Sequence, residues 1–186
     1  MTWNEIVSAI CICISSIIFS ISLQRTTRTK IMVTQLFACI FYISNYMVVL
    51  TILPSALMGL VAAIGELLRV FAFYFIERNE RFNTRTNNLI IGIIFSVVLS
   101  LCTIFAWNNW ICIFPLVGAV LVSTALGTKN VLTIKIAYML QALCITTYLF
   151  MLPLWLNAVT QVVVFISSVV GLIVYIHGQN KKCRID

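Results

Sequence analysis

Charged residues are scarce in this sequence, since only 9% of its 186 residues are Asp, Glu, Lys or Arg, whereas 62% are hydrophobic. A water-soluble domain is about one quarter charged and about one half apolar. So large an apolar fraction does not fit inside one soluble core of this length. The composition therefore excludes an ordinary soluble domain, and it predicts that lipid surrounds most of the side chains.

Residues that carry hydrolytic or metal chemistry are also few. The chain has one histidine, His177, and its seven cysteines form no CxxC pair. It contains no HExxH, GxSxG or Walker sequence and no Ser–His–Asp arrangement. We therefore expect no catalytic residue, no metal and no cofactor, and we do not expect an enzyme. The cysteines are interpreted as small apolar residues, with a disulfide between Cys102 and Cys112 left open.

The net charge of +7 does not indicate a nucleic-acid partner. The positive residues sit in short gaps between apolar runs, and no basic stripe interleaved with aromatic residues is present. Membrane topology explains this placement better, because Lys and Arg concentrate in the loops on one side of a membrane. The sequence thus predicts a lipid bilayer as the surroundings and no nucleic acid as a partner.

Seven apolar runs stand out along the chain, each close to the roughly 20 residues that a helix needs to cross a bilayer. Their polarity does not alternate as it would in the strands of a lipid-facing barrel. No Lys or Arg precedes the first run, so we interpret it as a helix rather than a cleaved signal. We predict an all-α, polytopic membrane helix bundle formed as a single domain over residues 1–186. The predicted helices span residues 4–23, 31–52, 55–76, 88–106, 110–126, 131–151 and 154–177.

Positive residues occupy alternate breaks between these runs. Eleven of the twelve Lys and Arg residues fall in three breaks and the C-terminal tail, and the breaks near Leu53, Trp107 and Leu152 contain none. The positive-inside rule places the N-terminus outside and the C-terminus inside. Trp107, Trp110 and Trp155 then suit an aromatic belt at the outer interface, with a ligand vestibule at WNNW as the alternative. The eleven are Arg25, Arg28, Lys30, Arg78, Arg81, Arg85, Lys129, Lys135, Lys181, Lys182 and Arg184.

The first three and last three runs share a layout, in which a helix rich in Tyr and Thr or Ser leads to a proline turn. With one helix between them, two such triplets have the same orientation, which is the parallel repeat of some small transporters. We predict two three-helix repeats, a linker helix and a basic cytoplasmic tail. These cover residues 1–77, 110–177, 88–106 and 178–186, respectively.

Four stretches carry a resemblance to the YgjV-type bacterial inner-membrane proteins: RTKIMVTQLFACIFYISNYMVV, LMGLVAAIGELLRVFAFYF, FPLVGAVLVSTALGTKNVLTIKIAYMLQALCITTYLF and AVTQVVVFISSVVGLIVY. It rests on helix layout, on Gln35 and Arg69, and on the LVG and T spacing in 110–126. The resemblance implies a multi-pass protein of the bacterial inner (plasma) membrane. It also implies the three-plus-one-plus-three plan of the SWEET and PQ-loop group. A sugar substrate is not implied, because run 55–76 lacks the Asn and Trp of that group and no Pro-Gln pair is present.

One acid and one base lie inside a predicted membrane helix. Glu66 and Arg69 are three residues apart in run 55–76, so they share a helix face and can pair. A lone charge at this depth costs on the order of 2.5–3.5 kcal/mol. Two interpretations stay open. The pair is either a structural ion pair that fastens the helix, or Glu66 lines a cavity and binds a polar or cationic group.

Other polar residues gather in runs 31–52 and 131–151. We expect them to line a midplane cavity between the triplets, where a small polar solute binds during transport. The alternative is that they form interhelical hydrogen bonds in a closed polar core, in a receptor or partner-binding subunit. Either arrangement suits a monomer or a homo-oligomer. The candidate solute-binding residues are Glu66, Arg69, Asn45, Tyr46, Tyr42, Gln141 and Tyr148; Gln35 and Tyr138 lie in the same runs, Ser123 and Gln161 are weaker candidates, and Pro54, Pro115 and Pro153 mark flexible points.

Overall fold

The computed structural model describes residues 3–53, 56–105, 109–152 and 154–182, with side chains as far as residue 179. Every regular element in this part of the chain is helical, which confirms the all-α prediction. Each of the seven long helices has the length and apolar composition needed to cross a membrane, the fifth when it is taken together with the 3-10 turn before it. They are α1 (Trp3–Gln24), α2 (Arg28–Ile52), α3 (Leu57–Arg78), α4 (Arg85–Phe105), α5 (Ile113–Gly127), α6 (Val131–Met151) and α7 (Trp155–Lys182), with a 3-10 turn η2 (Trp110–Cys112) leading into α5.

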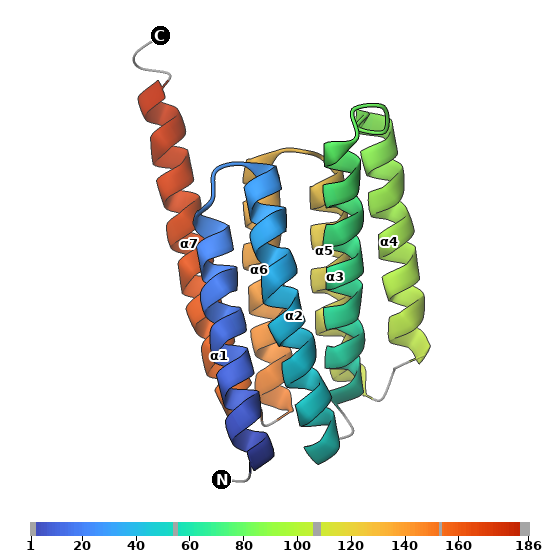
Figure 1. The fold of residues 1–186 in the computed structure, drawn as a ribbon, viewed down its shortest axis with the longest axis vertical. Helices are drawn as coiled ribbons and strands as arrows, with labels where there is room; N and C mark the ends of the chain where they lie inside the picture. The colour runs from blue at the N-terminus through green and yellow to red at the C-terminus, as the bar shows by residue number, and fades with distance from the viewer. Residues whose placement is uncertain (1–2, 54–55, 106–108, 153, 183–186) are drawn as a thin grey trace.

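The helix ends differ from the predicted segments where charged residues stand. α2 and α4 begin at Arg28 and Arg85, ahead of the predicted starts at 31 and 88. α7 continues to Lys182, so the first part of the predicted tail 178–186 is helical, and α7 projects beyond the other helices (Figure 1). Apolar runs underestimate helix length because long basic side chains in an end turn can reach the membrane surface without interrupting the helix.

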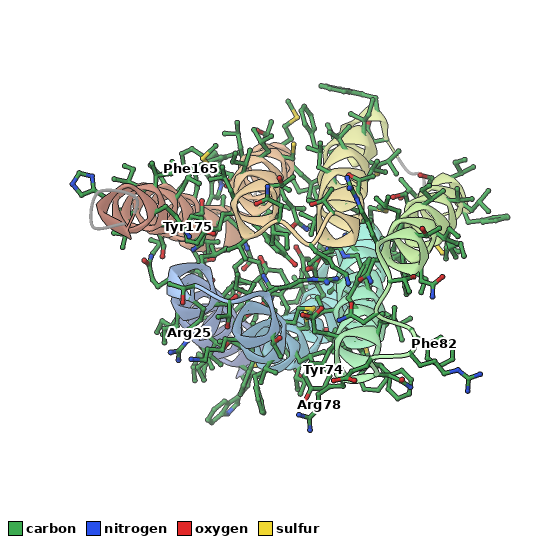
Figure 2. All side chains as sticks on the ribbon, turned by 90° about the horizontal axis from the view of Figure 1, so that it is seen from above. Arg25, Tyr74, Arg78, Phe82, Phe165 and Tyr175 are labelled. Carbon is green, nitrogen blue, oxygen red and sulfur yellow. The ribbon has the colours of Figure 1, made fainter. Side chains whose placement is uncertain are left out.

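The helices form two facing rows of three. α1, α2 and α3 make one row, α7, α6 and α5 make the other, and α4 lies outside them against α5 (Figure 2). The rows close on each other at both sides, where α1 packs on α7 and α3 packs on α5. Neighbours in sequence are therefore neighbours in space, and the space between the rows runs along the length of the bundle.

All the positive breaks lie at one end of the bundle (Figure 1). We call this the basic end; it holds the connections 25–27, 79–84 and 128–130 and the last turns of α7. The opposite end, where α1 begins and α2 ends, carries Glu5 but no Lys or Arg among its described residues, and we call it the uncharged end because it lacks these basic residues. Trp110 and Trp155 are exposed there, as an interfacial aromatic belt requires. Trp107, Pro54 and Pro153 lie outside the described residues, and Pro115 stands in the first turn of α5, so it marks the start of that helix.

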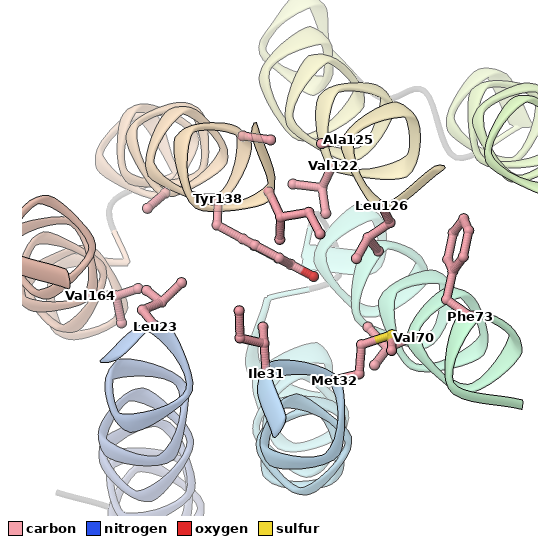
Figure 3. Packing of buried hydrophobic residues seen from close by; sticks show 13 residues of the cluster. Leu23, Ile31, Met32, Val70, Phe73, Val122, Ala125, Leu126, Tyr138 and Val164 are labelled. Atoms are coloured by element: carbon pink, nitrogen blue, oxygen red, sulfur yellow. The ribbon is translucent and has the colours of Figure 1, made fainter. Parts of the chain in front are cut away.

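Apolar packing between the rows is concentrated toward the basic end. A cluster drawn from six helices surrounds the Tyr138 ring, which reaches from α6 into the space between the rows (Figure 3). Leu23, Ile31 and Val70 contribute from the facing row. Smaller clusters at the uncharged end gather around Tyr148 and Tyr46. Large apolar side chains are exposed on every long helix, which suits a surface surrounded by lipid.

Two of the eleven basic residues that were assigned to the breaks belong to helices, and their side chains are buried. The assignment to the breaks is therefore wrong for these two residues. Arg28 begins α2 and Lys135 lies in the second turn of α6, with exposed fractions of 5% and 2%. Each has a polar partner on another helix, as described below. The hydropathy pattern could not separate them from loop residues, because burial depends on partners that are distant in sequence.

Candidate functional site

The predicted Glu66–Arg69 ion pair is present at the middle of α3. Arg69 Nη2 donates to Glu66 Oε2. Arg69 is fully buried, and its Nη1 donates to the Ala119 carbonyl at 2.7 Å and to Ser123 Oγ at 3.0 Å, both on α5. The guanidinium therefore faces α5 and fastens the two rows where they meet. A buried guanidinium needs such acceptors, because each unpaired N–H in an apolar medium is costly.

The Glu66 carboxylate faces the other way, toward α6. The Tyr138 hydroxyl lies 3.2 Å from Oε1, and Gln141 Nε2 donates to Oε2 at 3.2 Å. Tyr138 and Gln141 are three residues apart, so they share a face of α6. One carboxylate thus accepts from its own helix and from the opposite row. This joins α3 to α6 near the centre of the bundle.

Tyr138 also connects Glu66 to α2. Its hydroxyl oxygen lies 2.7 Å from Gln35 Oε1, so one hydroxyl hydrogen faces two acceptors, while Gln35 Nε2 has no hydrogen-bond partner among the described residues. The two ends of a Gln amide are assigned from the hydrogen-bond network. Turning the amide over makes Nε2 the donor to Tyr138 and leaves the hydroxyl hydrogen for Glu66. A continuous chain of polar groups then crosses from α2 through α6 to α3.

A cavity of about 70 Å³ lies between the rows and reaches from Glu66 toward the uncharged end. This is room for a few water molecules or a very small solute, and it is well below the roughly 300–1,000 Å³ of a drug-sized site. The cavity is lined by Phe19, Cys39, Tyr42, Tyr46, Gly59, Ala62, Ala63, Glu66, Pro115, Tyr138, Gln141, Ala142, Ile145, Tyr148 and Gln161.

Two buried polar atoms on the cavity wall lack a protein partner in the described part of the chain. They are Gln141 Oε1 and the Tyr148 hydroxyl. Gln141 stands beside Glu66, and Tyr148 lies two turns farther along α6, near the uncharged end. Buried polar atoms are normally hydrogen-bonded, so each exception needs an explanation. A polar molecule inside the cavity would supply one.

Five of the seven candidate solute-binding residues line this cavity. They are Tyr42, Tyr46, Glu66, Gln141 and Tyr148. Arg69 does not, because it turns toward α5. Asn45 does not either: its Oδ1 accepts from Ser8 Oγ at 2.7 Å, between α1 and α2. Asn45 lies about 100° around the helix from Tyr46, which is far enough to face α1 instead of the cavity.

The sequence reasoning missed part of the wall. Tyr138 was noted as a polar residue of its run but was not placed against Glu66, and Gln161 was only a weaker candidate. Phe19 and Cys39 gave no signal at all, because apolar residues on a membrane helix can face lipid, protein or a cavity equally well. Ser123, a weaker candidate, serves as a partner of Arg69.

Polar contacts hold the rows together toward the basic end. Lys135 Nζ on α6 donates to the Leu23 carbonyl at the end of α1, and the ammonium lies 5.6 Å from the centre of the Tyr175 ring. Gln24 Nε2 donates to the Ser167 carbonyl of α7 at 2.9 Å. A cation at the last carbonyls of a helix is favourable, because the C-terminal end of a helix carries partial negative charge.

At the same end, Arg28 connects α2 and α3 of one row with α4. Its Nη1 donates to Glu77 Oε2 on α3 at 2.6 Å, and its Nη2 donates to Asn88 Oδ1 on α4 at 2.8 Å. The guanidinium also lies 5.4 Å from the centre of the Phe73 ring. Lys129 Nζ donates to the Asn83 carbonyl at 2.7 Å, and this hydrogen bond joins the connections 79–84 and 128–130. The basic end is thus held by charged and polar groups from six helices and two connections.

Comparison of the chain with models of known protein families, with characterised proteins and with solved structures gives no match. The resemblance to the YgjV-type proteins therefore stays a prediction. A fold by itself does not determine a function, so the function is inferred below from the residues of the site.

Proposed function

We propose that this protein is a membrane transporter that moves a small polar solute through the cavity between the two helix rows. One observation carries the proposal: a carboxylate at mid-membrane depth lines a cavity whose wall also holds unpaired polar atoms. Ionisable residues inside a membrane are costly and usually serve a substrate or ion pathway. A purely structural ion pair would not require a cavity beside it.

The proposal includes membership of the YgjV-type inner-membrane family and an orientation. We place the basic end in the bacterial cytoplasm and the uncharged end outside, which agrees with the gathering of the positive connections at one end. A reporter enzyme that is active only in the cytoplasm, fused to the C-terminus, is expected to be active. The same reporter fused to the N-terminus is expected to be silent.

Two parallel triplets, α1–α3 and α5–α7, would provide the moving parts. A two-fold axis along the bundle would exchange α1 with α5, α2 with α6 and α3 with α7. Under this axis the α3–α5 contact corresponds to the α7–α1 contact. Both contacts occur, as the axis requires. The place of α4 outside the rows agrees with its role as a linker helix. Rocking of one triplet against the other would then expose the cavity on alternate sides.

The two ends differ in how the rows are held, and this indicates which side opens first. The cavity extends toward the uncharged end, where the rows meet through apolar side chains such as Met58 and Leu149. Opening at the basic end requires the Lys135–Leu23 and Gln24–Ser167 hydrogen bonds to break. We therefore propose that this is an outward-facing conformation of the transporter, in which the cavity is closed off at the basic end.

Cysteine accessibility tests the pathway. In a background without native cysteines, Ala62→Cys on the cavity wall is expected to react with a membrane-impermeant thiol reagent added from the uncharged side. Ala125→Cys is the matched control, because Ala125 is buried in the core toward the basic end. Equal protection of both cysteines from both sides would contradict a water-accessible pathway.

Solute binding tests the function itself. We expect at least one member of a panel of vitamins, nucleosides, amino acids, sugars and polyamines to raise the unfolding temperature of the purified protein, because a ligand of the folded state stabilises it by mass action. The shift should disappear in the double variant Glu66→Gln/Arg69→Gln, which removes the acid without leaving an unpaired buried cation. No shift with any solute would contradict the proposed site.

A receptor or partner-binding role is the second candidate function, and two observations favour it. The Glu66 carboxylate already accepts three hydrogen bonds, and the cavity is small. These features also suit a receptor-like or partner-binding membrane subunit with a closed polar core. Such a protein would show no solute-dependent stabilisation and no labelling of Ala62→Cys. The two experiments above therefore separate the candidate functions.

A further inference from the structure

We infer that the solute recognised at this site is a small protonated primary amine, with its ammonium group held by Glu66 and Gln141. The inference rests on the proposed function, because it assumes that the cavity is a solute site. It specifies the chemical class that the cavity wall would select. Charge, hydrogen bonding, aromatic surface and size each contribute to it.

The charge of the cavity wall favours a cation. Glu66 is the one Asp, Glu, Lys or Arg among the described lining residues. Its partner Arg69 points away and shares its hydrogens with the Ala119 carbonyl and Ser123 on α5. An anionic solute would thus meet a carboxylate before it met the guanidinium. In a medium of low dielectric constant, this arrangement disfavours anions strongly.

The carboxylate has capacity for one more donor. An ionised carboxylate offers about four lone-pair positions. Three of these are occupied by Arg69, Tyr138 and Gln141, and only the Tyr138 contact is on Oε1. The Glu66 side chain is 11% exposed, so it is not sealed from the cavity. An N–H of a solute can take the remaining position on Oε1.

The neighbouring amide supplies a second acceptor for the same group. Gln141 donates to Glu66 through Nε2 and leaves its Oε1 without a partner in the described structure. Glu66 and Gln141 together therefore place two acceptor oxygens side by side on one part of the cavity wall, with the Gln141 oxygen still buried in this conformation. An ammonium group carries three N–H donors and no acceptor, and so complements two acceptors better than a hydroxyl, which has a single hydrogen.

Aromatic rings form a large part of the remaining wall. Five ring side chains line the cavity: Phe19, Tyr42, Tyr46, Tyr138 and Tyr148. The Phe19 and Tyr138 rings meet edge to face at 5.6 Å, and Tyr42 and Tyr46 tilt against each other at 5.7 Å. The faces of aromatic rings attract cations, with the largest effect at desolvated sites. Rings also accommodate the apolar carbons of a short alkyl chain.

The size of the cavity limits the rest of the molecule. About 70 Å³ admits only a few non-hydrogen atoms, so nucleosides and sugars do not fit this conformation. Tyr148 lies two turns of α6, about 10 Å, beyond Gln141. A molecule of a few non-hydrogen atoms held at Glu66 is too short to span this separation, so it does not contact the unpaired Tyr148 hydroxyl in this conformation. A short amine meets the size limit.

The test compares amines with uncharged molecules of the same size. Purified full-length protein in lipid nanodiscs is titrated at neutral pH with methylammonium, propylammonium and ethanolamine chlorides. The matched solutes are methanol, 1-propanol and ethylene glycol, with sodium and potassium chloride as ionic controls. We expect saturable increases of several degrees in the unfolding temperature with the amines, and none with the alcohols. Calorimetry then gives the affinity of the best amine.

Variants locate the binding group. The double variant Glu66→Gln/Arg69→Gln should lower amine affinity by about tenfold to hundredfold, the equivalent of losing one hydrogen bond to a charged group. Glu77→Gln is the matched control, because Glu77 pairs with Arg28 at the basic end and does not line the cavity. It should bind amines with unchanged affinity, even if its unfolding temperature is lower.

Each remaining outcome has a distinct meaning. If alcohols or amides bind as well as amines and the double variant binds them too, the amine class is wrong while a solute site remains. If sodium or potassium alone reproduces the shift and competes with amines, the site binds a metal cation and the inference is overturned. If no small solute of any class stabilises the protein, both the amine inference and the proposed transport function fail.

Discussion

Apolar side chains join the two rows at both ends of the bundle, but the polar contacts differ between the ends. Toward the basic end, Lys135 and Gln24 make hydrogen bonds between the two rows, and Arg28 connects three helices of one side. Toward the uncharged end, the hydrogen bonds Asn4–Thr51 and Ser8–Asn45 stay within one row. The rows meet there through apolar side chains around Tyr148.

This difference indicates which contacts can separate easily. Inside a membrane, apolar contacts between helices can be replaced by contacts with lipid or with other side chains at little cost, whereas a buried charge that loses its partner has no substitute. The uncharged end is therefore the end where small movements of the rows cost least. The cavity extends from Glu66 toward the uncharged end, and Glu66 lies between the two ends of the bundle.

The largest effect on stability is expected at the Glu66–Arg69 pair, between the two ends of the bundle. Glu66→Leu should destabilise the protein by about 3–5 kcal/mol, because it leaves the fully buried Arg69 guanidinium without its counter-charge. The double variant Glu66→Leu/Arg69→Leu should recover most of this loss. The measurement is the free energy of unfolding in mixed detergent micelles. Equal stability of the single variant and the wild type would show that the pair is solvated.

The next effect compares one polar contact from each end. Arg28→Met should cost roughly 2 kcal/mol, less than a fully buried pair because the Glu77 side chain is 23% exposed to solvent. Asn45→Leu should change stability by less than about 1 kcal/mol, since interhelical hydrogen bonds in membranes are weak and the Asn45 Nδ2 has no partner in the described structure. The same unfolding assay measures both variants. A larger cost for Asn45→Leu would reverse the proposed difference between the ends.

A smaller effect is expected from the close approaches between helices. A Cβ at Gly171 would stand 2.6 Å from the Leu23 carbonyl oxygen, which moves only with the backbone of α1. A Cβ at Gly59 would stand 2.2 Å from the Tyr46 ring, which can turn into the cavity. Gly171→Ala should therefore cost about 1–2 kcal/mol after the gain in helix propensity. Gly59→Ala should be less destabilising but should abolish solute binding, and normal binding by this variant would mean that Tyr46 does not limit the cavity.

The smallest effect is expected at the uncharged end of the cavity. Tyr148→Phe removes a buried hydroxyl that has no partner among the described residues. Stability should stay within about 0.5 kcal/mol of the wild type or rise slightly, because no protein hydrogen bond is lost. Thermal unfolding without added solute measures this. A loss greater than about 1 kcal/mol would show that the hydroxyl has a structural partner.

The sequence was a good guide to the helices and to the ion pair. Each predicted apolar run became one helix, because the need to span a bilayer is a property of a continuous stretch of chain. The pairing of Glu66 with Arg69 followed from their spacing on one helix. Both features are local, so neither required knowledge of the neighbouring helices.

The sequence was a poorer guide to what each side chain faces. Asn45 and Tyr46 are adjacent in sequence, yet one contacts α1 and the other lines the cavity. The sequence pattern placed Arg28 and Lys135 in loops, but both side chains are buried. Arg28 pairs with Glu77, and Lys135 donates to the Leu23 carbonyl. Tyr138 was one of several tyrosines until the packing of the rows placed it between Gln35 and Glu66.

By itself, therefore, the sequence determined an all-helical chain with seven apolar helices and with most of its positive residues in or beside alternate breaks. Hydropathy and charge act along the chain, and lipid selects for them whatever the neighbouring helices are. Only the tertiary structure decided that the helices form two rows, that Arg69 faces α5 and that Glu66 faces a cavity with five aromatic rings. In lipid, apolar helix faces have little preference for one partner over another, so close packing and a few buried polar contacts choose among arrangements that hydropathy leaves equal.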